Sequence, residues 1–155
     1  MTTTTPTPSG SPRIRQAERV DLLAIYRIET QAFDQPWPFE AFEQFLGVPG
    51  FLVAEDGSVL GYIVVDTTLT PGGPVGHIKD LAVHEQRQGE GIGSLLVQRG
   101  LAAVDGVTDA VKLEVRESNE RAIDLYRRHG FRYHRRVSEY YEDGEDALVF
   151  VRATQ

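Results

Sequence analysis

One glycine-rich segment constrains the fold of this chain more than any other feature. Residues 77–83 have the composition of a β-strand, and residues 92–104 have the apolar spacing of a helix. Between them lies Gln88-Gly89-Glu90-Gly91-Ile92-Gly93, whose glycines allow positive φ and close approach of the backbone to a ligand. The first N–H groups of a helix lack partners within it and lie at the positive end of its dipole. The segment therefore predicts a strand, a turn and a helix start that can hold a phosphate or pyrophosphate.

Three other interpretations of these glycines have to be weighed. A tight turn with spare glycines explains the glycine count equally well. A dinucleotide-binding fingerprint needs a third small residue, and the spacing reaches Ser94 or Leu96 instead. Glu114 on the following strand could imitate the ribose-binding acid, so this alternative stays open. A Walker A loop is excluded because Gly-Lys-Ser/Thr is missing from the sequence.

The hydrophobic pattern along the rest of the chain predicts an alternation of strands and helices. Strands are expected at 12–17, 51–55, 59–68, 77–83, 111–116, 131–137 and 147–151. Helices are expected at 19–33, 39–46, 92–104 and 119–129. The central βαβ unit favours one parallel pair, and the flanking hairpins favour antiparallel neighbours. We therefore expect an α+β (mixed α/β) fold with three α/β/α layers around a central mixed, mostly antiparallel sheet.

Length and composition limit the number of domains. The chain has 155 residues, 41% of them hydrophobic, which suits one core. Residues 1–12 are Thr, Pro, Ser and Gly apart from the first Met, and we expect them to form a disordered tail. Residues 13–155 are then a single domain.

Charge and cysteine content limit the partners. The net charge of −7 argues against nucleic acid as a partner, because nucleic-acid binding needs a basic footprint. Apolar runs stay far below the roughly 18 residues of a membrane span, and the start of the chain lacks the pattern of a secretory signal. The chain has no cysteine, which excludes cysteine nucleophiles and thiolate metal sites. His84, His129 and His134 show no ligand spacing, so we expect no metal. From the short apolar runs and the absent cysteine we expect no membrane association and a cytoplasmic location.

Two stretches of the sequence resemble motifs of one superfamily. Gln88-x-x-Gly91-x-Gly93 resembles the (Gln/Arg)-x-x-Gly-x-(Gly/Ala) motif of the GCN5-related N-acetyltransferase (GNAT) superfamily. Residues 113–119 (Leu-Glu-Val-Arg-Glu-Ser-Asn), together with Ala122-Ile123-x-Leu125-Tyr126 and Gly130-Phe131, are similar to protein N-terminal acetyltransferases, especially the RimI-type ribosomal-protein alanine N-acetyltransferases. The resemblance covers about residues 13–152 and implies a GNAT-like fold.

The resemblance implies acetyl-CoA as co-substrate. It places the pantetheine arm against the strand at Leu81, Ala82 and Val83. It places the pyrophosphate and neighbouring groups against Gln88, Gly89, Glu90, Gly91, Ile92, Gly93, Ser94 and Asn119. Two positions depart from the family pattern: Glu85 stands where a proline is common, and Glu90 stands where a cation is common. We expect Glu90 to point to solvent.

Glu114 and Tyr126 are the catalytic candidates. Alternation in residues 111–115 puts Glu114 beside Lys112 on one strand face, and by itself this pattern favours a solvated face. The resemblance instead makes Glu114 the general base for the amine. Helical spacing by itself makes Tyr126 a core residue, and the resemblance makes it the proton donor to the departing thiolate. Its hydroxyl has a reference pKa near 10, which suits a donor that stays protonated at neutral pH.

The remaining candidates concern the acetyl acceptor. His77 is an alternative base, although a strand-edge histidine is the simpler interpretation. Phe33, Trp37, Tyr140 and Tyr141 could form the entrance for a peptide, or could be ordinary aromatic packing near the surface. We expect the acceptor to be a protein N-terminus, or an N-terminal peptide, with a ribosomal protein as one possible substrate. A small-molecule amine or lysine acceptor, and a CoA-binding regulatory module without turnover, remain as alternatives.

Overall fold

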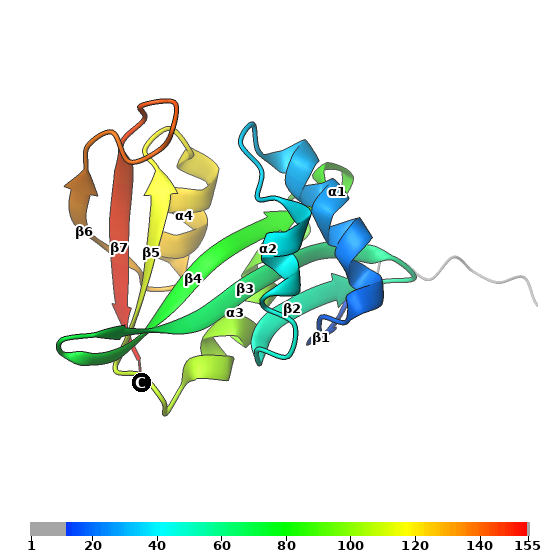
Figure 1. Ribbon diagram of the computed structural model, residues 1–155, viewed down its shortest axis with the longest axis horizontal. Coiled ribbons are helices and arrows are strands. Elements are labelled where there is room, and N and C mark those ends of the chain that lie inside the picture. Colours follow the sequence, from blue (N-terminus) through cyan, green and yellow to red (C-terminus); the bar gives the residue numbers. More distant parts are fainter. Residues whose placement is uncertain (1–11, 155) are drawn as a thin grey trace, which may run out of the picture.

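A computed structural model describes residues 12–154, so all but the last residue of the expected 1–12 tail lies outside the described residues. Its elements follow the predicted order, with two additional 3-10 turns (Figure 1). The strands are β1 (Arg13–Gln16), β2 (Gly50–Glu55), β3 (Val59–Thr70), β4 (Gly73–Val83), β5 (Ala110–Arg116), β6 (Arg132–Val137) and β7 (Ala147–Ala153). The helices are α1 (Leu22–Ala32), α2 (Phe39–Glu43), α3 (Ile92–Val104) and α4 (Glu120–Arg128), and the 3-10 turns are η1 (Arg19–Asp21) and η2 (Glu85–Arg87).

The boundaries of several elements differ from the predicted ones. The helix expected at 19–33 is divided into η1 and α1, and the helix expected at 39–46 ends at Glu43. Strand β4 begins four residues before the expected His77, because β3 and β4 form one long hairpin in which Thr70 pairs with Gly73. Residues 73–76 are Gly-Pro-Val-Gly, so glycine and proline, which are typical of a turn, hide the start of this strand from a hydrophobic pattern.

All seven strands of residues 12–154 belong to one sheet in the order β1-β2-β3-β4-β5-β7-β6. Among them, the β4–β5 pair is parallel, and every other pair of neighbours is antiparallel. The prediction of a mixed, mostly antiparallel sheet is therefore confirmed. The crossover between β4 and β5 is made by α3, as a βαβ unit requires.

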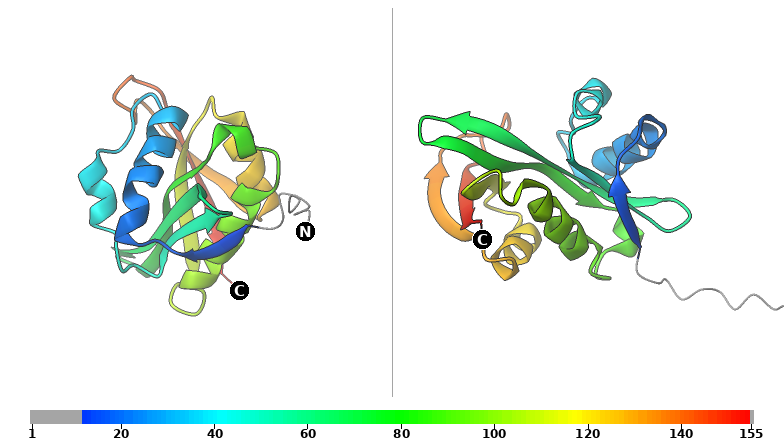
Figure 2. Two further views of the ribbon diagram at one scale, coloured as in Figure 1. Left: turned by 90° about the vertical axis from the view of Figure 1, so that its right-hand side faces the viewer. Right: turned by 90° about the horizontal axis from the view of Figure 1, so that it is seen from below.

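Helices cover both faces of this sheet, which makes three layers (Figure 2). Apolar residues of α1 and α2 pack on one face against Phe51, Val53, Tyr62 and Val64. On the other face, α3 and α4 bury a larger cluster that includes Leu96, Ile63, Val111 and Tyr126. The two faces are filled by alternate residues of the same strands, which is the period-two pattern that predicted them.

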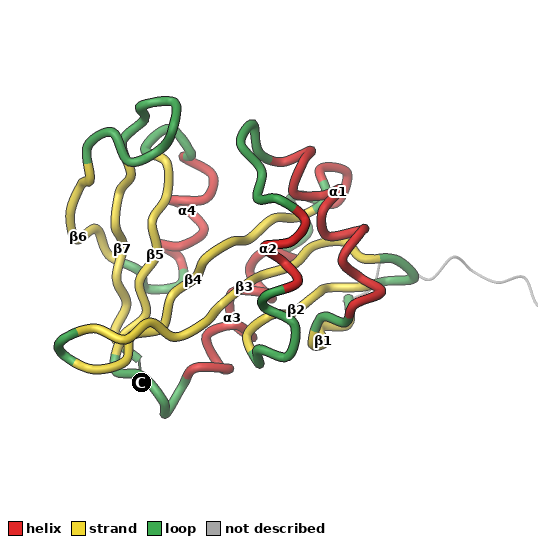
Figure 3. Tube along the Cα trace, viewed as in Figure 1, coloured by secondary structure: helices red, strands yellow, loops and turns green. Residues whose placement is uncertain are grey.

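The parallel pair β4–β5 is short and then opens. Residues 76–78 of β4 pair with residues 111–113 of β5. Beyond Ile78, β4 continues to Val83 paired with β3 only. The pairing register of β3 and β4 also shifts at Lys79, because Val64 faces Asp80 while Val65 faces Ile78. Figure 3 shows β4 and β5 diverging, with the α1–α2 connection on one side of the gap and the β6–β7 loop on the other. This divergence places backbone and side chains of β4 in the floor of a groove.

Candidate active site

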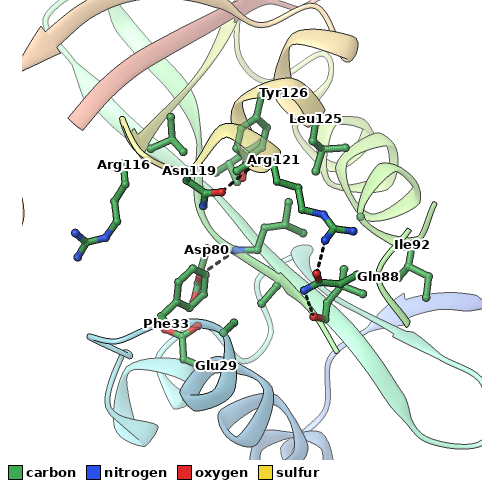
Figure 4. Close-up of a pocket in the computed structure, with 18 of the residues that line it drawn as sticks. Glu29, Phe33, Asp80, Gln88, Ile92, Arg116, Asn119, Arg121, Leu125 and Tyr126 are labelled. Atoms are coloured by element: carbon green, nitrogen blue, oxygen red, sulfur yellow. Dashed lines mark hydrogen bonds between the residues drawn. The ribbon is translucent and has the colours of Figure 1, made fainter. Parts of the chain in front are cut away.

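One groove runs from the start of α3, across the gap between β4 and β5, to the α1–α2 connection (Figure 4). We call residues 87–94, Asn119 and Arg121 the cofactor wall. We call Glu29, residues 33–37, His77, Asp80, Glu114, Tyr140 and Tyr141 the acceptor wall. A second hollow adjoins the groove and is lined by residues of the acceptor wall together with Ala41, Phe45 and Lys79.

The cofactor wall is built by the start of α3. Gly91 is the N-cap and has φ +85°, a left-handed conformation that side chains disfavour. The first helical N–H groups therefore open onto the groove without a side-chain cap. The amide of Gln88 donates to the Val83 carbonyl at 3.2 Å, and Arg121 donates to the Gln88 amide oxygen at 2.6 Å. The geometry and the donors both fit a pyrophosphate.

The structure brings together nearly all of the residues expected to contact acetyl-CoA. Those that line the groove are Leu81, Ala82, Val83, Gln88, Gly89, Gly91, Ile92, Gly93, Ser94 and Asn119. Glu90 does not line it: this residue is exposed and its carboxylate pairs with Arg87 Nε at 2.9 Å. Asn119 is also the N-cap of α4, where its side chain accepts from the Ala122 N–H at 3.2 Å.

Glu114 projects from β5 into the groove and is largely shielded, with 13% of its side chain exposed. His77 Nε2 lies 3.1 Å from its carboxylate, and Lys112 Nζ lies 3.8 Å away. Burial raises the pKa of Glu114, but the His77 hydrogen bond and the charges of His77, Lys112 and Lys79 outweigh it, so the pKa is lowered overall. The expectation of a fully solvated strand face is wrong, because α2 and the β6–β7 loop flank this part of β5.

Tyr126 combines the two roles that the sequence left open. Its ring belongs to the core below the sheet and meets Phe131 edge-on at 5.7 Å between centroids. The same residue lines the groove beside Asn119 and Leu125. Burial, the largest cause, raises its pKa above the ordinary tyrosine value, so the hydroxyl stays protonated at neutral pH.

The aromatic residues predicted for the peptide entrance gather at the acceptor wall. Phe33, Trp37 and Tyr141 line the main groove, and Trp37, Tyr140, Tyr141 and His77 line the adjoining hollow. Tyr140 and Tyr141 meet edge-on at 5.0 Å, and the Arg116 guanidinium lies 4.0 Å from the Tyr141 ring centroid. Arg116 also binds Asp143 and Glu145, so the β6–β7 loop is held against β5.

Sequence reasoning missed several residues of the groove. Arg87, Arg121 and Arg128 line it near the start of α3, and their cations suit an anionic ligand. Glu29 and Asp80 line the acceptor wall, although they lie 51 residues apart in sequence and on different layers. The only hint of Glu29 was a carboxylate on the apolar face of a helix, at helical spacing from Leu22 and Ile25.

Two negative observations apply to residues 12–154. They contain no group of three histidine, aspartate or glutamate side chains that is arranged to hold a metal ion. Across the same residues, every helix is too short or too polar to cross a membrane.

The sequence matches known proteins over most of its length. Residues 22–131 match the family model described as the acetyltransferase (GNAT) family. An N-alpha-acetyltransferase of Sulfurisphaera tokodaii is 38% identical over 154 aligned residues, which cover 88% of this chain and 90% of that protein. A putative ribosomal protein bS18-alanine N-acetyltransferase of Bacillus subtilis is 32% identical, over 88% of this chain and 91% of that protein.

Solved structures share the fold. Ard1 from Thermoplasma volcanium superimposes with a TM-score of 0.84 at 27% sequence identity, over 94% of this chain and 99% of that one. The family match, the relatives and the groove agree with one another. The chain therefore belongs to the acetyltransferase (GNAT) family and is an acetyl-CoA-dependent N-acetyltransferase.

Proposed function

We propose that the amine of a protein N-terminus attacks the thioester of acetyl-CoA directly, in a ternary complex, with Glu114 as base and Tyr126 as acid. The observation that carries this proposal is that both residues line the same groove as the start of α3. A covalent enzyme intermediate is not needed, which agrees with a chain that has no cysteine. The acceptor and the thioester can meet where β4 and β5 diverge.

The proton balance assigns a task to each residue. The amine nitrogen forms a bond to the acetyl carbon, and the bond from that carbon to sulfur breaks. The proton released by the amine passes to the Glu114 carboxylate, directly or through a water molecule. The thiolate takes its proton from the Tyr126 hydroxyl. We assign the backbone N–H of Val83 to the developing oxyanion, since this strand residue lines the groove at the same point.

An N-terminal α-amine suits this arrangement better than lysine does. Its reference pKa is about 7.7–8.0, against roughly 10.4 for lysine, so a much larger fraction is neutral before any catalysis. The first residues of the peptide would lie between the α1–α2 connection and the β6–β7 loop, in contact with Phe33, Trp37, Tyr140 and Tyr141. Because one relative is named for a ribosomal protein, an N-terminus of a ribosomal protein is a substrate to test.

The test is a panel of acceptors incubated with the wild-type chain and acetyl-CoA. It contains peptides that differ in their first residue, the same peptides with a blocked N-terminus and a free lysine, and small amines. Products on free α-amines alone are expected. Acetylation of the blocked peptides would favour lysine as the acceptor, and products with small amines alone would favour a metabolic role.

Tyr126→Phe separates turnover from binding in the same assay. Loss of the hydroxyl should lower kcat by about a hundredfold, the lower end of the range for general acid–base catalysis, while the ring keeps its contact with Phe131. Full activity in this variant would show that Tyr126 only packs in the core and is not the proton donor. If the wild type binds acetyl-CoA but gives no product with any acceptor of the panel, the result would favour the alternative of a CoA-binding regulatory module without turnover.

A further inference from the structure

Two acidic side chains from different layers meet in the acceptor wall, and the proposed mechanism uses neither of them. Glu29 comes from the last turn of α1 and is 2% exposed. Asp80 comes from β4, directly after the register shift at Lys79. Both line the groove, and Figure 4 labels them on either side of Phe33. A pair of buried carboxyls is costly unless a proton or a counter-charge compensates it.

The hydrogen bonds of Glu29 identify it as an acceptor. One of its carboxylate oxygens accepts from the Tyr62 hydroxyl, and the other accepts from the backbone N–H of Trp37 at 2.8 Å. The second bond is the important one for function, because Trp37 belongs to the α1–α2 connection. Glu29 thereby fixes this loop to α1 and β3.

The hydrogen bonds of Asp80 are incomplete unless it carries a proton. Its Oδ1 accepts from the Leu81 N–H at 2.9 Å. Its Oδ2 is closed off from solvent and has no donor among residues 12–154. Two side chains face Asp80: the Glu29 carboxyl, itself an acceptor, and the Tyr62 hydroxyl, whose proton is already donated to Glu29. One proton on Asp80 Oδ2 would allow a hydrogen bond from Asp80 to the Glu29 carboxylate, since a protonated carboxyl is a donor.

We propose that Asp80 is a protonated carboxyl that donates to Glu29, and that this shared proton positions the α1–α2 connection for the acceptor peptide. The chain of contacts runs from the Leu81 amide through Asp80 and Glu29 to the Trp37 amide. It joins the strand proposed to hold the thioester to the loop proposed to hold the peptide. Asp80 and Glu29 are therefore positioning residues.

The groups facing Asp80 come from three other elements. They are Glu29 of α1, Tyr62 of β3 and Tyr126 of α4. Arg116 of β5 lies in the same groove but is bound by Asp143 and Glu145. Burial, then the hydrogen bond and charge of Glu29, raise the pKa of Asp80 well above its ordinary value, against smaller opposing contributions from Leu81 and Tyr62. A raised pKa means that the shared proton is kept above the ordinary value of 3.8 and is lost as the pH rises through the folded-state value.

Trp37 offers a direct readout, because it is the only tryptophan of the chain. Acrylamide quenching of its fluorescence measures how firmly the α1–α2 connection is held, with or without any substrate. Asp80→Asn keeps a donor toward Glu29 and an acceptor for Leu81, but it cannot lose a proton. Asp80→Ala removes both. Asp124→Asn, an exposed position on α4, is the control for a lost carboxylate charge.

At neutral pH we expect acrylamide to quench Trp37 at least about twice as readily in Asp80→Ala as in the wild type. Quenching in Asp80→Asn and in Asp124→Asn should match the wild type. In alkaline buffer the quenching of Trp37 should increase in the wild type, because the α1–α2 connection is held less firmly, and should not increase in Asp80→Asn. If Trp37 is quenched as readily in Asp80→Asn as in Asp80→Ala, the proposal is overturned, because the proton would then have no role. The proposal also fails if Asp80→Asn loosens with pH as the wild type does. Should alanine prevent folding, the comparison of the wild type with Asp80→Asn still decides.

The kinetic arm depends on the proposed function, because it needs a peptide acceptor. The KM for the peptide should rise about tenfold in Asp80→Ala, the effect of one broken buried hydrogen bond, and return to within about twofold in Asp80→Asn. The KM for acetyl-CoA should change less than about twofold in both. A peptide KM unchanged in Asp80→Ala would contradict the positioning role. Absence of turnover in the wild type would instead count against the proposed function and leave the fluorescence result valid.

Discussion

The two walls of the groove differ in charge and in origin. The cofactor wall presents free helix amides and the cations Arg87 and Arg121, and most of it comes from one continuous segment. The acceptor wall presents the carboxyls of Glu29, Asp80 and Glu114, which come from three elements far apart in sequence. The first wall suits a polyanion, and the second suits an amine that arrives with a positive charge.

This difference explains how one groove can serve two substrates of opposite charge. Helix dipoles and arginines attract phosphates, whereas they would repel an ammonium group. The divergence of β4 and β5 keeps the two regions apart and lets them meet only at the reacting atoms. Substitutions that alter one wall at a time test this difference.

The largest effect is expected on the acceptor wall. Glu114→Gln keeps the shape of the side chain but removes the base, so kcat should fall by about 10² to 10⁴. Acetyl-CoA binding, measured by calorimetry, should stay within about twofold, because Glu114 belongs to the other wall. Glu120→Gln, on the first turn of α4, is the matched control. A Glu114→Gln enzyme with wild-type kcat would remove Glu114 from the mechanism.

The pH profile is the next largest effect. The pKa of Glu114 is lowered from its ordinary value of 4.5, so the base is ionised above that value and is lost only as the pH falls through the lowered one. The decline of kcat/KM below about pH 8 should therefore follow the α-amine, about tenfold per pH unit. Measuring the profile with peptides whose α-amines differ in pKa checks this. If the decline of kcat/KM at low pH does not change with the pKa of the peptide α-amine, the titrating group belongs to the enzyme instead.

On the cofactor wall the expected effect is smaller and appears in binding. Arg121→Ala removes a cation and the contact to Gln88, so the Kd for acetyl-CoA should rise about fivefold. The loss should shrink at high salt, because salt screens an exposed cation. The KM for the peptide should not change. Arg99→Ala, on α3 outside the groove, is the control, and an equal effect there would indicate net charge alone.

The smallest effect concerns His77. If its task is to donate a hydrogen bond to Glu114, then His77→Gln, whose amide can also donate, should keep kcat within about threefold. His77→Ala should lose more and should move the acid limb of Glu114 upward, because the hydrogen bond lowers that pKa. A loss in His77→Gln as large as in Glu114→Gln would make His77 the base instead.

The sequence by itself determined the order of the elements and most of the cofactor wall, although not its arginines. Both depend on local rules: a strand, two glycines and a helix start lie within about twenty residues, and period two or period 3.6 identifies each element. Asn119 directly precedes α4 and caps it, which is again a local pattern. Element boundaries at hairpin ends, such as the start of β4 at Gly73, were missed because exposed strand residues carry no hydrophobic signal.

The tertiary structure alone decided the acceptor wall. Glu114 could be a solvated residue or a shielded one, and only the approach of His77 and the β6–β7 loop makes it shielded. Glu29 and Asp80 meet because α1 packs on the face of the sheet to which the register shift in β4 turns Asp80. Contacts between distant segments leave no periodic trace in a sequence, since each partner looks like an ordinary acid in its own element. Burial then changes the protonation of such a pair, and burial is a property of the folded chain.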